Sequence, residues 1–541
     1  MSKLLTPRRI VIMLVLALAV GCAVRNFYVS PGYSRAFSHV PDSVENTLAM
    51  KNLMAGRGFT IRLDGVDYRS RYQPWFSLLF VAPALAFSGG NVLCSWYGCF
   101  AAGVLALFAA FMIGRKIGGG FCGVLLAAVL GIFADFARYT NVAMTEVPHT
   151  MLLLFAAAAW IRLCEREETR AIDYLLFGVL CALAGALRST ALVLPAIALL
   201  PLLKRRPGRK TTLGALAAAW APAAAVAAAN AVYNKFAFGG FFRSGYHFWA
   251  PVNYDYPGMT FSWRFVAGNL KGYANGYDLL FLALPAAVTA IGWCILRRRD
   301  REAALKLGHY AVFAAAVAAI TIGVYLPYFS FQERFFVPVR ALAMLGGAAA
   351  AALAATDFFR RRRDTVLCIA AVAVAAAPWP DPHEEQLKHD GLRSAKIDLL
   401  IRMHDTLPEN AVLLTIFQQG AAEYFFVGDS GRRIIPFFRC YEYAQMVTAK
   451  RRIPAPPGGF ERMELAEAND YIAGHGGVRP YPWVYTEDPE KVDEMIRSGV
   501  PVYVSDYTLM IHKPARELAR RYELRPAGKS EIFCFYRLMP R

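Results

Sequence analysis

The sequence has no CxxC pair and no cluster of cysteine and histidine at metal-ligand spacing, although it contains 10 Cys and 9 His. This absence excludes the common structural zinc modules. The glycine-rich stretches 458–459 and 474–477 lack the GxGxxG spacing of a dinucleotide-binding unit. No repeat of fixed period is present, which excludes a solenoid. The cysteines therefore read mainly as small apolar side chains.

Acidic residues are scarce: 40 Asp and Glu stand against 59 Lys and Arg, for a formal net charge of +19. Such an excess can mark a nucleic-acid-binding protein. Here, however, the basic residues fall mostly in short clusters between long hydrophobic runs, as expected where they set the orientation of membrane helices. With 56% hydrophobic residues, the chain is predicted to be an integral membrane protein that binds no nucleic acid.

Long apolar runs predict a polytopic α-helical membrane protein with about eleven transmembrane helices. The first run follows Arg8-Arg9. The runs cover approximately residues 10–24, 93–113, 118–137, 147–163, 172–187, 189–203, 211–232, 276–296, 307–327, 335–357 and 365–379.

A further apolar run at 74–88 decides which side of the membrane each later segment is predicted to face. If it crossed the membrane, the later basic clusters, such as Arg297-Arg298-Arg299, would lie on the side opposite to Arg8-Arg9. The positive-inside rule opposes that arrangement. We therefore expect 74–88 to be a juxtamembrane helix in the first outer loop. The N-terminus is then cytoplasmic and the C-terminus extracytoplasmic, which in a bacterial inner membrane means periplasmic.

The composition changes after Ala377, which predicts two domains: a transmembrane domain at 1–379 and a soluble extracytoplasmic α/β domain at 380–541. Short β-like runs at 412–416 and 500–504 support the α/β class. A disulfide between Cys440 and Cys534 is possible in an oxidising compartment. The sequence leaves that pairing open.

Two acids are placed on the outer side by this topology. Asp42 follows the first apolar run, and Glu146 opens the run at 147–163. Each has an ordinary structural explanation: Asp42 is compatible with a helix N-cap, and Glu146 with an acid that complements the helix dipole. An acid at the water boundary of a membrane helix is also a candidate for chemistry on a lipid-borne substrate.

The order of motifs resembles the GT-C superfamily of lipid-linked sugar transferases, especially protein O-mannosyltransferases and the aminoarabinose transferases of lipid A. Asp42, Gly56, Gly58 and Phe59 fit the family's motif after the first helix, with a second acid about a hundred residues later at Glu146. Further matches are Tyr72-Gln73-Pro74-Trp75, Leu187-Arg188-Ser189 and Glu333-Arg334-Phe335-Phe336-Val337-Pro338. The chain departs from the motifs at Ser43 and Asn46, at Ala49, which falls one position early, and at Gln73, where a basic residue is expected.

The resemblance implies transfer of a sugar from a polyprenyl (undecaprenyl) phosphate donor to a lipid, glycan or protein acceptor on the extracytoplasmic side. Such a reaction needs a base for the acceptor and cations for the departing phosphate. Asp42 is the candidate base, and Glu146 would orient the acceptor. The two acids could also hold a divalent metal, although none is required. The candidate phosphate ligands are Arg69, Arg71, Arg188, Arg334 and Arg340.

Two of these arginines, Arg188 and Arg340, lie in or beside apolar runs, where each also has an ordinary structural explanation. Arg340 lies inside an apolar helix, where an unpaired guanidinium is costly; it could instead snorkel to the interface or pair with Glu333. The aromatic loop after residue 236 contributes Tyr246, His247 and Trp249 as candidate substrate contacts. The alternative for these is an aromatic belt at the headgroup level.

Two other classes of function compete with the glycosyltransferase. A lipid or sugar transporter or flippase would favour an inverted repeat and ionisable residues midway through the helices, which the sequence lacks. A non-catalytic membrane scaffold would leave the paired outer acids and Arg340 unexplained. The sugar and the acceptor are not indicated by any motif.

Overall fold

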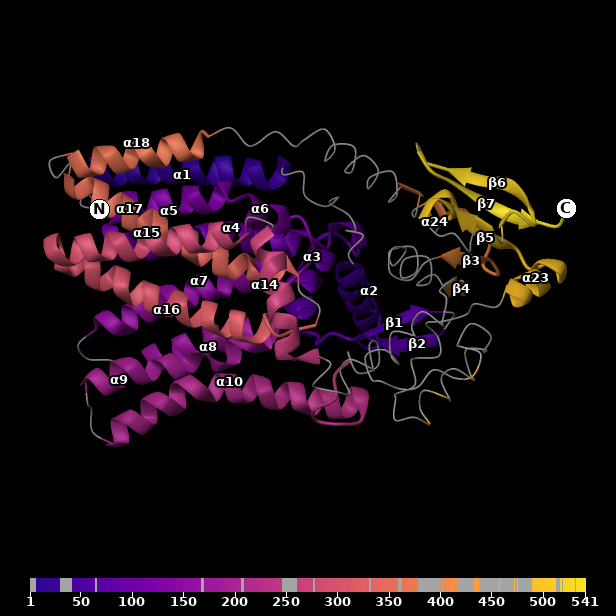
Figure 1. Cartoon of the computed structure of the whole chain (residues 1–541), viewed down its shortest axis with the longest axis horizontal. Helices are drawn as coiled ribbons and strands as arrows, with labels where there is room; N and C mark the ends of the chain where they lie inside the picture. Colours follow the sequence, from indigo (N-terminus) through magenta and orange to yellow (C-terminus); the bar gives the residue numbers. More distant parts are fainter. Residues whose placement is uncertain are drawn as a thin grey trace. The chain divides into compact units, whose positions relative to one another are not determined.

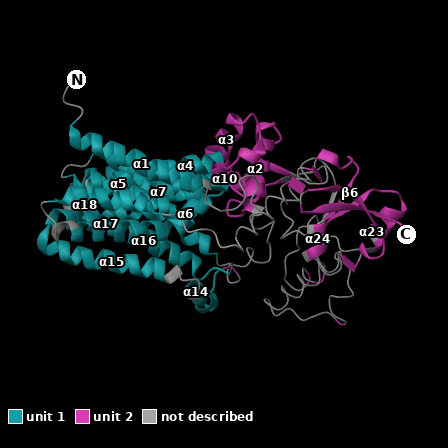
Figure 2. Cartoon of the chain, turned by 90° about the horizontal axis from the view of Figure 1, so that it is seen from above, with its two compact units in different colours: residues 1–32, 97–231, 261–381 teal, residues 33–96, 232–260, 382–541 magenta. Residues whose placement is uncertain are grey.

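The computed structural model describes residues 6–29, 41–63, 66–166, 170–205, 209–245, 260–275, 278–329, 332–358 and 362–377, and parts of the C-terminal region. Those parts are 398–399, 402–403, 405–415, 433–436, 457, 471, 474, 489–511, 516–517, 519–530 and 532–541. The chain divides into two compact units (Figure 2). The first comprises 1–32, 97–231 and 261–381, and the second 33–96, 232–260 and 382–541.

The first unit is built from helices (Figure 1). Apolar helices predominate because a membrane span must satisfy its backbone hydrogen bonds within itself. Its long helices are α1 (Pro7–Val29), α4 (Tyr97–Gly118), α5 (Gly120–Ile132), α7 (Glu146–Glu165), α8 (Ala171–Leu187), α10 (Arg209–Phe238), α15 (Asp278–Arg299), α16 (Arg301–Tyr325), α17 (Val337–Phe358) and α18 (Arg363–Ala375). Shorter elements are α6 (Ala134–Tyr139), η3 (Ser189–Ala198), α9 (Leu199–Arg205), η4 (Trp263–Phe265), α14 (Val266–Asn275) and η5 (Glu333–Phe336). The last residues of α10 belong to the second unit.

Seven helices among the described residues are long and apolar enough to cross a membrane. They are Pro7–Tyr28, Val92–Gly118, Glu146–Glu165, Thr211–Phe238, Leu280–Arg299, Arg301–Tyr325 and Glu333–Ala355. Shorter apolar helices cover Gly120–Ile132, Ala171–Leu187 and Ser189–Lys204. The chain is therefore a polytopic helical membrane protein, while the predicted count of about eleven spans stays a prediction.

Small residues let these helices approach closely. A Cβ atom added to Gly114 of α4 would lie 2.7 Å from the carbonyl oxygen of Cys122 in α5. One added to Gly178 of α8 would lie 2.3 Å from the carbonyl oxygen of Ala219 in α10. Because lipid and helix surfaces are equally apolar, such close backbone packing is a main source of helix association in a membrane.

The second unit begins with the loop between α1 and α4. This loop contains α2 (Pro41–Met54), the antiparallel hairpin of β1 (Thr60–Leu63) and β2 (Val66–Arg69), the π-helical turn η1 (Ser77–Val81), α3 (Ala82–Phe87) and η2 (Val92–Cys94). The apolar helix Ser77–Phe87 is about 16 Å long at 1.5 Å per residue, roughly half the thickness of the hydrocarbon core. Its length agrees with the expectation that this run does not span.

The C-terminal part of the second unit contains a five-stranded sheet in the order β4-β3-β5-β7-β6. Parallel pairs join β3 to β4 and β5, and antiparallel pairs join β7 to β5 and β6. The runs expected as strands form β3 (Val412–Thr415) and β5 (Val502–Ser505), accompanied by β4 (Arg433–Pro436), β6 (Glu523–Lys529), β7 (Cys534–Met539), α23 (Pro489–Arg497) and α24 (Asp506–Ile511). Cys440 lies outside the described residues, so its disulfide with Cys534 stays a prediction.

One hydrophobic core joins the loop between α1 and α4 to this sheet. Val44 and Leu48 of α2 and Phe59 beside the hairpin are buried in the same cluster as Leu413 of β3 and Phe535 of β7. The second unit is therefore made from segments far apart in the sequence.

The domain boundary predicted at 379/380 stays a prediction. The C-terminal part of the second unit starts at residue 382.

Candidate active site

Helix α2 carries the first candidate acid, Asp42, in its first turn. Glycines terminate the helix: Gly56 and Gly58 have φ values of 77° and 79°, in the left-handed region that favours glycine. The amide of Arg57 donates to the carbonyl of Asn52 at 2.9 Å, which closes the last turn. The paired glycines of the motif thus turn the chain from α2 into the hairpin.

The hairpin returns the chain to α2. Thr60 of β1 pairs with Arg69 of β2, and the amide of Ser70 donates to the carbonyl of Phe59 at 3.3 Å. Phe59 is buried, which fixes the hairpin against α2. As a result, Ser70 and Arg71 face the first two turns of that helix.

Four residues, Asp42, Glu45, Ser70 and Arg71, form what we call the α2 cluster. Arg71 Nη2 lies 3.0 Å from Asp42 Oδ1, and its Nε lies 2.8 Å from Glu45 Oε2. The Ser70 hydroxyl and the Arg71 amide each donate to Glu45 Oε1 at 2.8 Å. One guanidinium therefore holds two carboxylates.

The two carboxylates differ in their environment. The Glu45 side chain is fully buried, whereas that of Asp42 is 21% exposed. Burial raises the pKa of Glu45 above its ordinary value, and the charge of Arg71 and the bonds from Arg71 and Ser70 oppose that rise. Asp42 is consequently the carboxylate of this cluster that a substrate can reach.

Glu45 is the residue that the sequence did not single out. In the sequence, Glu45, Asn46 and Asn52 look like the polar face of a surface helix, yet all three are buried. The sequence did contain a signal that Glu45 belongs to the site, because Glu45 lies one helical turn after Asp42 on the same face of the helix. Its cation comes from beyond the hairpin, which spacing alone does not reveal.

In the first unit, Glu146, Arg188 and Arg334 form what we call the α7 cluster. Glu146 is the first residue of α7, Arg188 ends α8, and Arg334 lies in η5. Arg188 Nη2 lies 2.7 Å from Glu146 Oε1, and Arg334 Nε lies 3.8 Å from the same oxygen. Here one carboxylate faces two guanidinium groups.

The α7 cluster is closely packed, and not every buried polar atom in it has a hydrogen-bond partner among the described residues. The Glu146 side chain is 1% exposed and that of Arg188 is 9% exposed. The ring of Phe335 lies 5.5 Å from Arg188 Cζ and 5.6 Å from Arg334 Cζ, within reach of cation–π attraction. Arg188 Nη1 is buried with no hydrogen-bond partner among the described residues. The cluster thus keeps an excess of positive charge.

Arg340 of α17 is paired, but not through the expected side chain. Its Nη1 lies 2.9 Å from Asp135 Oδ2 of α6, and its Nη2 donates to the backbone carbonyl of Glu333 at 3.3 Å. The pairing considered from the sequence was with the Glu333 carboxylate. The distance in sequence between α6 and α17 hides Asp135 from any local pattern.

The other candidate residues are distributed as follows. Arg69 is exposed at the end of β2, and its Nη1 would lie 3.2 Å from a Cβ atom on Gly58. Tyr246, His247 and Trp249 lie outside the described residues. In the part of the chain that the structure describes, no group of three or more His, Cys, Asp or Glu could hold a metal ion. Guanidinium groups face both Asp42 and Glu146, and the metal site considered for these two acids stays a prediction.

The sequence matches no protein-family model. No curated protein sequence matches it either. The structure is similar to ArnT from Cupriavidus metallidurans bound to undecaprenyl phosphate, with a TM-score of 0.55 and 12% identity over 96% of this chain and 97% of that one. The apo state of the same ArnT gives a TM-score of 0.54 at 12% identity, over the same shares of the two chains. The chain therefore has the fold of ArnT.

Proposed function

We propose that this chain is a GT-C-type glycosyltransferase of the bacterial inner membrane. It transfers a sugar from a polyprenyl phosphate donor to a lipid, glycan or protein acceptor on the extracytoplasmic side. The observation that carries the proposal is the α2 cluster, which presents Asp42 as a partly exposed carboxylate fixed by Arg71. It is supported by the fold, which is that of a protein solved with undecaprenyl phosphate.

The reaction sets what the residues must do. The bond between the anomeric carbon and the phosphate oxygen breaks, and the polyprenyl phosphate leaves with the electron pair. A hydroxyl or amine of the acceptor forms the new bond to that carbon and loses a proton. Asp42 receives this proton, because a carboxylate within hydrogen-bond reach of the acceptor can act as general base.

Arg71 and Glu45 support Asp42 in this role. Arg71 orients Asp42 through the contact at 3.0 Å, and the buried Glu45 fixes Arg71 from its other side. A base held in one orientation avoids part of the entropic cost of aligning it with the acceptor. In this proposal Arg71 acts mainly on Asp42, whereas the sequence suggested phosphate binding for it.

The α7 cluster is the better candidate for the phosphate. Arg188 and Arg334 together carry one charge more than Glu146, the acid that both face. Guanidinium groups bind phosphate oxygens through charge-assisted hydrogen bonds. Glu146 holds Arg188 at 2.7 Å, and we assign it this orienting role in addition to contact with the acceptor. Arg69 and Arg340 stay secondary candidates for the phosphate.

The test is transfer of radiolabelled sugar from a panel of polyprenyl phosphate donors to membrane acceptors. Wild type is compared with Asp42→Asn and with Asp364→Asn, which removes an exposed acid paired with Arg8 at 2.8 Å. We expect wild type and Asp364→Asn to transfer and Asp42→Asn to fail. Equal transfer by all three proteins would reject Asp42 as base. No transfer by wild type from any donor would reject the proposed function.

A further inference from the structure

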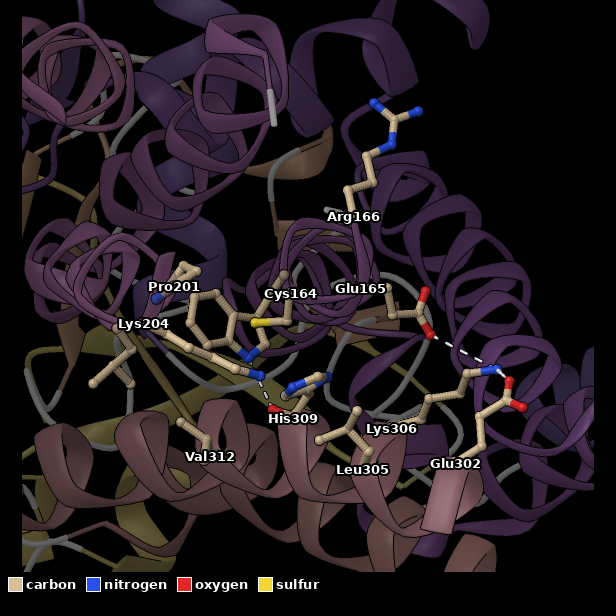
Figure 3. A pocket seen from close by; sticks show the side chains of 12 residues that line it. Cys164, Glu165, Arg166, Pro201, Lys204, Glu302, Leu305, Lys306, His309 and Val312 are labelled. Atoms are coloured by element: carbon tan, nitrogen blue, oxygen red, sulfur yellow. Dashed lines mark hydrogen bonds and ion pairs between the residues drawn. The ribbon is translucent and has the colours of Figure 1, made fainter. Parts of the chain in front are cut away.

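A second polar site lies at the opposite, basic end of the helical unit. The end of α7, helix α9 and the first half of α16 surround a cavity of about 800 Å³ (Figure 3). This volume is within the range of small-ligand sites. The cavity is lined by Trp160, Cys164, Glu165, Arg166, Leu200, Pro201, Lys204, Glu302, Leu305, Lys306, His309 and Val312.

The cavity combines apolar walls with a charged rim. Trp160 is 1% exposed, and its indole nitrogen donates to the backbone carbonyl of His309 at 2.8 Å, which ties α7 to α16. Leu200 and Leu305 line the cavity from α9 and α16. This mixture suits an amphipathic ligand better than a fully hydrated ion.

The Lys, Arg and Glu side chains that line the cavity, apart from Lys204, lie in ion pairs. Lys306 lies between two acids, 2.6 Å from Glu302 and 4.0 Å from Glu165 (Figure 3). Arg166 donates to both carboxylate oxygens of Asp173 at 2.7 Å. Lys204 forms no ion pair with an acidic side chain of the described residues. The rim therefore offers one uncommitted cation to an anion.

A second cavity adjoins this one along α16. It has a volume of about 580 Å³ and is lined mainly by small apolar residues of α15, α16 and α17. Leu305, His309 and Val312 line both cavities. A charged cavity next to an apolar one matches the two parts of a phospholipid, whose headgroup and acyl chain are joined.

The location agrees with this ligand. The ends of α7, α9 and α15 here carry basic residues, including Arg297-Arg298-Arg299. The positive-inside rule assigns such an end to the cytoplasmic face. Basic pockets between membrane helices on that face bind lipid headgroups. We propose that this cavity binds a glycerophospholipid of the cytoplasmic leaflet, with its phosphate on Lys204 and an acyl chain along α16.

Lipid titration followed by native mass spectrometry tests the site on the delipidated full-length protein. The probe is palmitoyl-oleoyl phosphatidylglycerol. We expect Lys204→Gln to weaken binding about fivefold, since one basic residue near an anionic lipid contributes on that scale. Arg298→Gln is the matched control, because Arg298 is an exposed cation at the same end that does not line the cavity. It should bind as wild type does.

Two further measurements separate a lipid from a simple anion. Ala315→Phe fills the apolar cavity from an exposed position on α16 and should weaken lipid binding. Inorganic phosphate at the same concentration should not displace the lipid. Displacement by inorganic phosphate together with normal binding by Ala315→Phe would leave an anion site and overturn the lipid assignment. Equal lipid binding by Lys204→Gln and wild type, or no binding by wild type, would overturn the site.

Discussion

The α2 cluster and the α7 cluster use the same two kinds of side chain in opposite proportions. In the α2 cluster, Asp42 and Glu45 share Arg71. In the α7 cluster, Arg188 and Arg334 share Glu146. With every group ionised, the first carries one excess negative charge and the second one excess positive charge.

The difference indicates different chemistry. An excess carboxylate can accept a proton, whereas an excess guanidinium can bind an anion and cannot be deprotonated in a protein. The clusters should therefore respond differently to the loss of their central residue, and the following variants compare those responses.

Arg71→Ala should give the largest effect, because it leaves the buried Glu45 without its cation. Breaking a buried ion pair typically costs about 3–5 kcal/mol in the free energy of unfolding. Glu45 can escape part of this cost by taking up a proton, so the loss should shrink at low pH. Chemical denaturation at several pH values measures this. Arg402→Ala, which breaks an exposed pair with Asp398, is the control and should change little.

Glu146→Gln should lower the free energy of unfolding by about 3 kcal/mol, the lower end of the range for a broken buried ion pair, since it removes the acid that faces buried Arg188. In contrast to Arg71→Ala, lowering the pH should give no recovery, because arginine is already protonated and acid cannot remove its charge. Denaturation measured as for Arg71→Ala checks both statements. Glu302→Gln, at a position 79% exposed, should leave stability nearly unchanged. Recovery of Glu146→Gln at low pH would contradict the assigned charges.

Glu45→Gln should change the pH dependence of stability more than the stability itself. The folded-state pKa of Glu45 is raised above its ordinary value of 4.5. The folded protein therefore binds more protons than the unfolded chain between these two pKa values, and stability falls as the pH rises through that window. Glu45→Gln should lack this decline. A decline of equal size in wild type and Glu45→Gln would assign it to another group.

Gly58→Ala should give the smallest effect, about 1 kcal/mol of lost stability, because alanine is strained at a φ of 79°. The added Cβ atom would also lie 3.2 Å from Arg69 Nη1. Thermal melting compared with Gly268→Ala, whose added Cβ atom meets nothing within 4 Å, measures the combined effect of the backbone conformation and this contact. A melting temperature equal to that of Gly268→Ala would show that the hairpin tolerates the strain.

The sequence predicted the helical membrane class because apolar runs are a local property. It also predicted Asp42 and Glu146 as acids at the starts of helices. This was possible because the motifs that contain them, including the glycine pair after Asp42, are contiguous in the sequence. Glu45 and Asp135 were not predicted as ion-pair partners, because each meets its arginine only after the chain folds back. Partners separated by a hairpin or by several helices leave no periodic signal.

The central claim is the division of labour between a proton-accepting α2 cluster and a phosphate-binding α7 cluster. Its most direct test is the affinity of purified wild type, Asp42→Asn and Arg334→Gln for undecaprenyl phosphate. We expect Asp42→Asn to bind nearly as wild type does. Arg334→Gln should bind about tenfold more weakly, since a lost charge-assisted hydrogen bond costs roughly 1.5–3 kcal/mol. Weaker binding by Asp42→Asn than by Arg334→Gln, or unchanged binding by Arg334→Gln, would contradict the division.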